Sequence, residues 1–177
     1  NGLNYLFLKR LLSIPNKEHV RYVRELAQNE LFFEHVNQAL KGIGQPVGEI
    51  RALGPELIYT VVRAVRPKIA VETGVAAGVS SAYILRALED NRFGDLYSID
   101  MPGYDMQPYE KGMIRTLPAR LRDDQVGVCI PTNLKQRWHL KIGISENVLP
   151  SLLKQLGELD VFLHDSEHSY ENMLFEY

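Results

Sequence analysis

The sequence lacks several features that mark whole classes of proteins. With a single cysteine, Cys129, it can form no internal disulfide, as is usual in a reducing compartment. No apolar stretch approaches the roughly 20 residues of a membrane span, and the N-terminus lacks the apolar core of a secretion signal. Neither sign of charge is in excess, because 20 Lys and Arg face 22 Asp and Glu, which argues against nucleic acid and anionic membranes as partners. We therefore expect a cytoplasmic protein that binds neither.

The composition that remains is that of an ordinary globular domain. The 177 residues are 45% hydrophobic and 24% charged, close to the globular average. At roughly 150 residues per domain, this is one domain or one domain with an appendage. A chain of this length buries about 70% of its unfolded surface, which is enough for a hydrophobic core.

The first 48 residues are helical in pattern. Apolar residues at helical spacing predict a helix that stops at Pro15 and a second helix, capped by Asn16, with one apolar stripe that runs to Gly42. Glycines then mark a turn-rich linker over residues 42–48. We expect residues 1–48 to form a helical extension that either covers the sheet or contacts a second copy of the chain in a homodimer.

From residue 54 onward, helices alternate with short apolar strands. Pro55 opens a helix that ends before Pro67. The expected strands then span residues 68–73, 95–100, 138–144 and 159–164, and the expected helices span 80–88 and 148–156, the second starting around Pro150. The proline-rich segment 101–136 holds a candidate helix over 110–122. This alternation predicts a Rossmann-like α/β fold over residues 49–177, with a doubly wound parallel sheet between two layers of helices.

The segment 71–81 (VETGVAAGVSS) runs from a strand through a glycine turn into a helix. Gly74 can adopt a positive φ and allow close approach of a ligand, and Gly78 permits tight packing of the helix on the strand. The free N–H groups at the start of a helix favour polar or anionic ligand groups. The middle glycine of the dinucleotide fingerprint is missing, which argues against NAD.

Two carboxylates lie beside this turn. Asp100 ends the second strand, where a carboxylate can accept hydrogen bonds from both hydroxyls of a ribose. Glu72 lies just before the turn and suits a positively charged group, such as the ammonium of an amino acid. The alternatives are a structural Lys or Arg partner for Glu72 and a turn-capping role for Asp100. A ligand that combines a ribose with a cation points to S-adenosylmethionine.

With these residues, the sequence resembles the class I S-adenosylmethionine-dependent methyltransferases, in the branch that acts on small molecules and sugars. Four segments carry the resemblance: 71–81, LYSID at 96–100, GIS at 143–145 followed by VLP at 148–150, and LDVFLHDSEHSY at 159–170. The resemblance implies cofactor contacts by Glu72, Thr73, Gly74, Val75, Gly78, Ser80, Asp100, Gly143, Ile144, Ser145 and Asp165. The family's sheet has seven strands, so we expect its C-terminal strands to be missing from this chain.

The cluster at residues 164–168 follows the fourth predicted strand, where ligands bind in open α/β sheets. Asp165 or His168 could be the general base that removes a proton from a substrate hydroxyl. Asp165 also resembles the first carboxylate of the magnesium-dependent O-methyltransferases, which implies Mg²⁺ as a second cofactor. A zinc pair of His164 and His168 is disfavoured, because a spacing of four suits a helix and His164 belongs to the strand. In a purely structural alternative, His168 and Tyr170 cap and pack the next helix.

Together, these features predict an enzyme that moves a methyl group from S-adenosylmethionine to a small-molecule acceptor, at a hydroxyl oxygen. Asp165 and His168 are its predicted catalytic residues. Two alternatives stay open: a non-catalytic cofactor-binding or scaffold domain, and an NAD-dependent or nucleotide-sugar enzyme on the same fold. Trp138, at the start of the third strand, is expected in the core and not as a platform for adenine.

Overall fold

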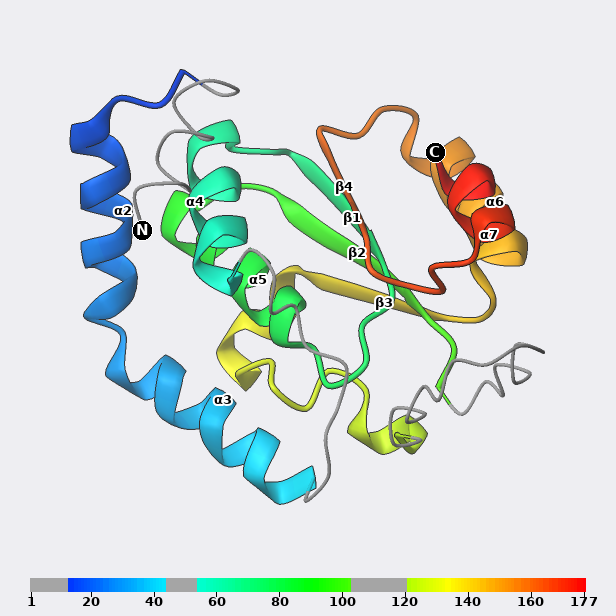
Figure 1. The fold of residues 1–177 in the computed structure, drawn as a ribbon, viewed down its shortest axis with the longest axis horizontal. Helices are drawn as coiled ribbons and strands as arrows, with labels where there is room; N and C mark the ends of the chain where they lie inside the picture. The colour runs from blue at the N-terminus through cyan, green and yellow to red at the C-terminus, as the bar shows by residue number, and fades with distance from the viewer. Residues whose placement is uncertain (1–12, 44–53, 103–120) are drawn as a thin grey trace.

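The computed structural model describes residues 13–43, 54–102 and 121–177. Its centre is a parallel four-stranded sheet in the order β3-β2-β1-β4 (Figure 1). The strands are β1 (Ile69–Thr73), β2 (Asp95–Asp100), β3 (Trp138–Ile142) and β4 (Val161–His164). The predicted Rossmann-like α/β class is therefore confirmed. Because all strands run in one direction, their C-terminal ends meet at one edge of the sheet.

Helices cover both faces of the sheet (Figure 1). One face packs against α4 (Pro55–Val65) and α5 (Val79–Asn91), in a core that includes Ala70, Leu96 and Leu85. The other face packs against α6 (Ser145–Leu156), with α7 (Tyr170–Glu176) beside it, in a core that includes Val71 and Leu152. Consecutive residues of β1 therefore face opposite layers of helices.

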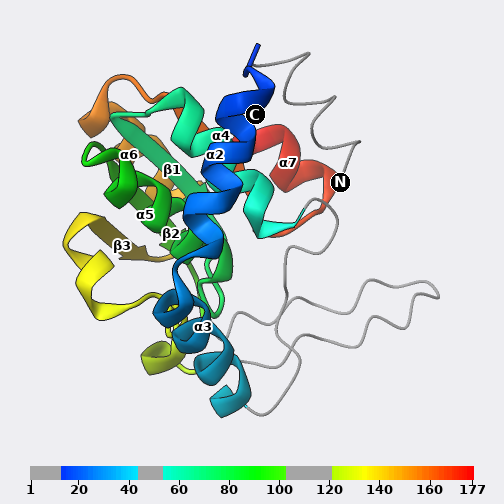
Figure 2. The ribbon, with the colours of Figure 1, turned by 90° about the vertical axis from the view of Figure 1, so that its left-hand side faces the viewer.

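The N-terminal helices lie outside this three-layer arrangement. Two helices, α2 (Asn16–Ala27) and α3 (Glu30–Ile43), replace the single predicted helix, with α2 outside α4 (Figure 2). At the break, the side-chain amide of Asn29 donates to the carbonyl of Glu25 in place of the backbone N–H, which donates to Leu26 instead. Pro15, and not Asn16, is the N-cap of α2, and no side chain caps it. The predicted helix before Pro15 lies outside the described residues.

Several other boundaries differ from the prediction: β3 ends at residue 142 and not 144, β4 begins at 161 and not 159, and α5 extends to 91 and not 88. Helix α6 begins at Ser145, so Pro150 lies inside it and not at its start. Pro150 lies beyond the first turn, whose N–H groups have no partner within any helix. Its missing N–H therefore removes one hydrogen bond of the helix. The candidate helix over 110–122 lies almost wholly outside the described residues, and residues 123–125 and 132–137 form the short 3₁₀ helices η1 and η2. In the described part of the chain, no helix is both long and apolar enough to cross a membrane.

Candidate functional site

The glycine turn after β1 has the backbone conformation that the sequence predicts. Gly74 and Gly78 have φ of 83° and 82°, in the left-handed region that favours glycine. A Cβ atom on Gly74 would overlap with the carbonyl of Asp165, so this glycine admits the chain that follows β4. A Cβ atom on Gly78 would lie 2.7 Å from Cα of Gly127, so this glycine makes room for a loop and not, as predicted, for a strand.

That loop, residues 126–130, supports the turn from the side of α5. The N–H of Gly127 donates to the carbonyl of Ala76 at 2.9 Å, and the N–H of Cys129 donates to the carbonyl of Ala77 at 2.8 Å. The ring of Trp138 packs against Gly127, and its indole N–H donates to Ser98 Oγ at 2.8 Å. Trp138 is thus part of the packing, as predicted, whereas the contact of this loop with the glycine turn was not predicted.

Asp100 lies where the sequence predicts it, at the end of β2 beside the turn. Its Oδ1 accepts hydrogen bonds from the N–H groups of Val75 at 3.0 Å and Ala76 at 3.5 Å. Burial raises the pKa of Asp100 above its ordinary value, and the two N–H groups oppose this shift. Asp100 therefore caps a turn, but it is the glycine turn of β1 and not the turn that follows its own strand. Its other oxygen, Oδ2, takes no part in these bonds.

Glu72 is turned away from this edge. Its side chain is 0% exposed and lies against α5, where Oε1 accepts hydrogen bonds from Ser81 Oγ at 2.5 Å and Ser98 Oγ at 2.6 Å. Burial raises the pKa of Glu72 to about 7, against the opposing effect of these hydroxyls. A direct contact with a ligand ammonium does not fit this geometry. The alternative prediction, a structural Lys or Arg partner for Glu72, does not hold either. No Lys or Arg of the described ranges forms an ion pair with Glu72.

The other predicted cofactor residues split into two groups. The side chains of Thr73, Val75 and Ser80 are buried, so only their backbone could face a ligand at the strand edge. Gly143, Ile144 and Ser145 form the connection from β3 to α6, and the N–H of Gly143 donates to the carbonyl of Asp100 at 2.9 Å. This bond holds the third strand end beside the second.

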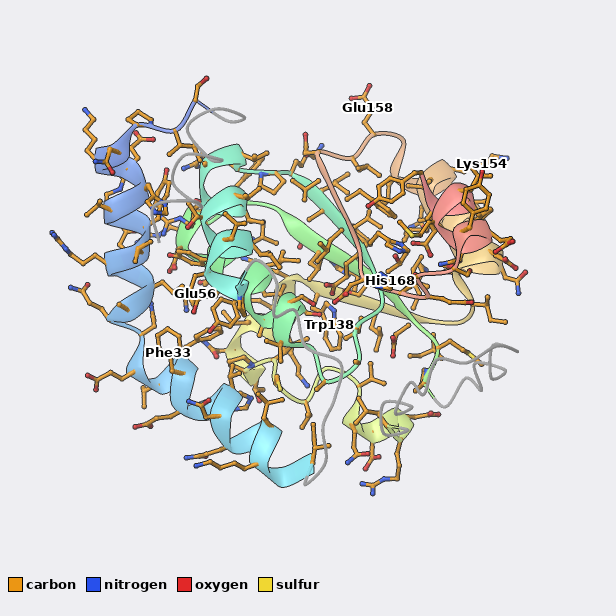
Figure 3. All side chains as sticks on the ribbon, in the orientation of Figure 1. Phe33, Glu56, Trp138, Lys154, Glu158 and His168 are labelled. Atoms are coloured by element: carbon orange, nitrogen blue, oxygen red, sulfur yellow. The ribbon has the colours of Figure 1, made fainter. Side chains whose placement is uncertain are left out.

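At the end of β4, Asp165 and His168 form a pair. Nε2 of His168 lies 3.8 Å from Oδ1 of Asp165, and the His168 side chain is half-exposed (Figure 3). Burial raises the pKa of Asp165 above its ordinary value, while His168 and His164 oppose this shift. The N–H of Asp165 donates to the carbonyl of Thr73 at 2.9 Å. Both predicted catalytic residues therefore lie at the same edge as the glycine turn.

The capping alternative for this cluster does not fit the structure, and the described residues give no support for the metal. Within the described ranges, no group of three or more His, Cys, Asp or Glu side chains could hold a metal ion. Ser169, and not His168, caps α7, because its hydroxyl accepts the N–H of Asn172 at 3.2 Å. Tyr170 is 74% exposed, so it does not pack the helix against the core.

Sequence reasoning missed Glu176, on the last turn of α7. Its fully buried carboxylate meets the ends of β1 and β4: Oε2 accepts from Thr73 Oγ1 at 2.5 Å and lies 2.6 Å from His164 Nδ1. A carboxylate placed between two aromatic residues, Phe175 and Tyr177, could have drawn attention to it. His164 is 3% exposed, and within the described ranges its Nε2 has no hydrogen-bond partner.

A family model described as "Methyltransferase domain" matches residues 71–177, which is more than half of the chain. The strand order, the glycine turn and this match define the class: the chain belongs to the S-adenosylmethionine-dependent methyltransferases of class I, and the predicted resemblance is confirmed. No curated protein matches the sequence.

Solved structures share the fold at low sequence identity. The O-methyltransferase TomG from Streptomyces achromogenes, solved with S-adenosylmethionine, is 15% identical, with a TM-score of 0.55 over 99% of this chain and 65% of its own. An O-methyltransferase from Bacillus cereus, solved with S-adenosylhomocysteine, is 14% identical, with a TM-score of 0.53 over 97% and 64%. The methyltransferase PaMTH1 from Podospora anserina is 14% identical, with a TM-score of 0.51 over 86% and 59%. The chain thus spans less than two thirds of the length of these structures.

Proposed function

We propose that this chain forms the cofactor-binding part of an enzyme that transfers the methyl group of S-adenosylmethionine to a hydroxyl oxygen of a small molecule. The observation that carries the proposal is the position of Asp100. Two N–H groups of the glycine turn fix its Oδ1, and Oδ2 is left for the hydroxyls of a ribose. The half-exposed pair of Asp165 and His168 lies at the same edge of the sheet, on the other side of the turn.

The residues fit this cofactor in several respects. The glycines at 74 and 78 place no side chain at either end of the turn, and the connection at 143–145 is bonded to Asp100 beside the ribose position. When bound, the cofactor supplies an electrophilic methyl group on a sulfonium ion. Glu72 contributes indirectly, because it bonds the first turn of α5 and does not reach the ligand.

The chemistry left to the protein is positioning and the removal of one proton. His168 is exposed enough to meet an acceptor hydroxyl and takes its proton, while Asp165 orients and stabilises the charged imidazole. The proposal assigns no role to a magnesium ion, for which the described ranges provide no cluster of ligands.

A calorimetric titration of the full-length protein with S-adenosylhomocysteine tests the cofactor site. We expect a dissociation constant on the order of 1 μM and a loss of about tenfold or more in Asp100→Asn, because the amide replaces one of the two acceptor oxygens. Asp95→Asn is the matched control: this residue begins the same strand, at the opposite edge of the sheet, and should leave the affinity unchanged. A folded protein that binds NAD but not S-adenosylhomocysteine would contradict the proposal.

Catalysis is tested separately from binding. In His168→Ala, we expect the affinity for S-adenosylhomocysteine to be retained and the turnover to fall about 10² to 10⁴-fold, the usual contribution of a general base. The measurement is the release of S-adenosylhomocysteine from S-adenosylmethionine in the presence of a panel of phenols, catechols and sugars. If the wild type binds the cofactor but turns over none of them, and His168→Ala changes nothing, the non-catalytic alternative is favoured.

A further inference from the structure

Glu176 gathers hydrogen-bond donors from three parts of the site. Its Oε2 accepts a hydrogen bond from Thr73 Oγ1 at 2.5 Å and lies 2.6 Å from His164 Nδ1. Its Oε1 receives Ser166 Oγ at 3.0 Å, and Asn172 Nδ2 lies at 3.3 Å. The side chain is 0% exposed, so none of these bonds competes with water.

The positions of these donors in the chain are informative. Thr73 immediately precedes Gly74, the first glycine of the turn, and its carbonyl accepts the N–H of Asp165. His164 and Ser166 are the two neighbours of Asp165, and each bonds a different oxygen of Glu176. One carboxylate therefore holds the start of the glycine turn and both sides of Asp165.

The charge state of Glu176 suits this arrangement. Burial alone would favour the neutral acid, but hydrogen bonds, among them those from Thr73, His164 and Ser166, outweigh it and hold the pKa of Glu176 below its ordinary value. An ionised carboxylate only accepts hydrogen bonds, so Nδ1 of His164 must carry a hydrogen and donate. All contacts of Glu176 are then charge-assisted, and these are short and directional.

We propose that Glu176 is a positioning residue, which fixes the backbone of the glycine turn and of Asp165 relative to each other and so sets the geometry of the ligand site. The proposal rests on the proposed function in one respect, the identity of the ligand. Its structural content is independent: the backbone of Gly74 and that of Asp165 are in contact, and Glu176 holds the residues next to both.

The test compares Glu176→Gln with Glu171→Gln in the full-length protein. The first variant keeps the size of the side chain but replaces one acceptor oxygen with a donor, so one of the two pairs of bonds is lost. Glu171 lies on the exposed first turn of the same helix and is the matched control. Two quantities are measured: the affinity for S-adenosylhomocysteine, and amide hydrogen exchange resolved by NMR.

In Glu176→Gln, we expect the affinity to fall about tenfold and the exchange of the Gly74 and Asp165 amides to accelerate about tenfold, with the exchange of the core amide of Leu96 unchanged. The control should change neither quantity. A uniform acceleration that includes Leu96 would overturn the proposal, because Glu176 would then act on global stability alone. Unchanged exchange at Gly74 and Asp165, or local acceleration without loss of affinity, would overturn it as well.

Two further arms keep the result decisive. If Glu176→Gln does not fold, Ser166→Ala and Thr73→Val each remove one donor, and the same local acceleration is expected in each. If the wild type does not bind S-adenosylhomocysteine at all, the proposed function fails, and the exchange measurement still decides the positioning role. The two failures are thus distinguishable.

Discussion

Two fully buried carboxylates lie on opposite sides of β1, and they differ in their ionisation. Glu72 points from the strand toward α5, and Glu176 reaches from α7 to Thr73, the next residue of the strand. Both side chains are 0% exposed. Burial raises the pKa of Glu72 to about 7, whereas the pKa of Glu176 lies below its ordinary value because hydrogen bonds outweigh burial.

The difference lies in the donors that each site provides. Glu72 receives two short bonds from serine hydroxyls, both on one oxygen, and its Oε2 has only a long contact of 3.5 Å with Ser80. Glu176 receives donors on both oxygens, including the imidazole of His164. A buried charge is tolerated only when enough donors replace water. The α7 side of the strand therefore holds a stable anion, and the α5 side holds a group that gains and loses a proton near neutral pH.

The largest effect is expected from removing the stable anion. Glu176→Ala leaves the donors of Thr73, His164 and Ser166 buried without an acceptor. We expect the free energy of unfolding in urea to fall by about 4 kcal/mol. Glu171→Ala, on the exposed side of the same helix, should change it by less than about 0.5 kcal/mol. Equal effects of the two substitutions would show that the bonds of Glu176 do not stabilise the fold.

The second effect concerns Glu72, the carboxylate with the raised pKa. Between about pH 4.5 and 7, the folded protein keeps a proton on Glu72 that the unfolded chain has lost, so stability falls as the pH rises through this range. A pKa raised from 4.5 to about 7 corresponds to about 3 kcal/mol. Glu72→Gln is neutral at every pH and keeps an acceptor for the two serines. Above pH 7 we therefore expect it to be more stable than the wild type by up to about 3 kcal/mol.

The measurement is urea unfolding of both proteins at pH 5 and pH 8. Other groups titrate in this range, but the difference between the wild type and Glu72→Gln isolates Glu72. The only tryptophan, Trp138, donates to Ser98, which in turn bonds Glu72, so its fluorescence provides an independent readout of the titration. Identical pH dependence in the two proteins would contradict the expected shift.

The sequence allowed these two carboxylates to be predicted only in part. Strand and turn patterns are local, so β2, the glycine turn and the position of Asp100 could all be predicted. Glu72 was recognised as significant, but alternation along a strand buried on both faces does not say which layer a side chain meets. Its enclosure by Ser81 and Ser98 depends on the packing of α5 and β2, far away in the sequence.

Glu176 and the loop at 126–130 could not be predicted, for a related reason. Glu176 meets Thr73 across 103 residues of chain, and Gly127 meets Ala76 by a backbone bond that no side-chain pattern encodes. The break between α2 and α3 was missed because the apolar stripe continues across it, while Asn29 supplies a local start signal for α3. For Glu176 and the loop, what sequence reasoning lacked was a tertiary contact.

The smallest effect is the difference in stability between variants of two neighbouring serines of α5. It tests whether hydrogen bonding by Ser81 stabilises the ionised form of Glu72. Ser81 Oγ lies 2.5 Å from Oε1 of Glu72, and Ser80 Oγ lies 3.5 Å from Oε2, at the limit of a hydrogen bond. Ser81→Ala should cost about 2 kcal/mol of unfolding free energy at pH 8, where the acceptor is charged, and about 1 kcal/mol at pH 5, where it is neutral. Ser80→Ala, in the same turn and with the same change in helix propensity, should cost less than about 0.5 kcal/mol at both. If the two variants lost equal stability at pH 8, hydrogen bonding by Ser81 would not be what holds the charge of Glu72 inside the protein.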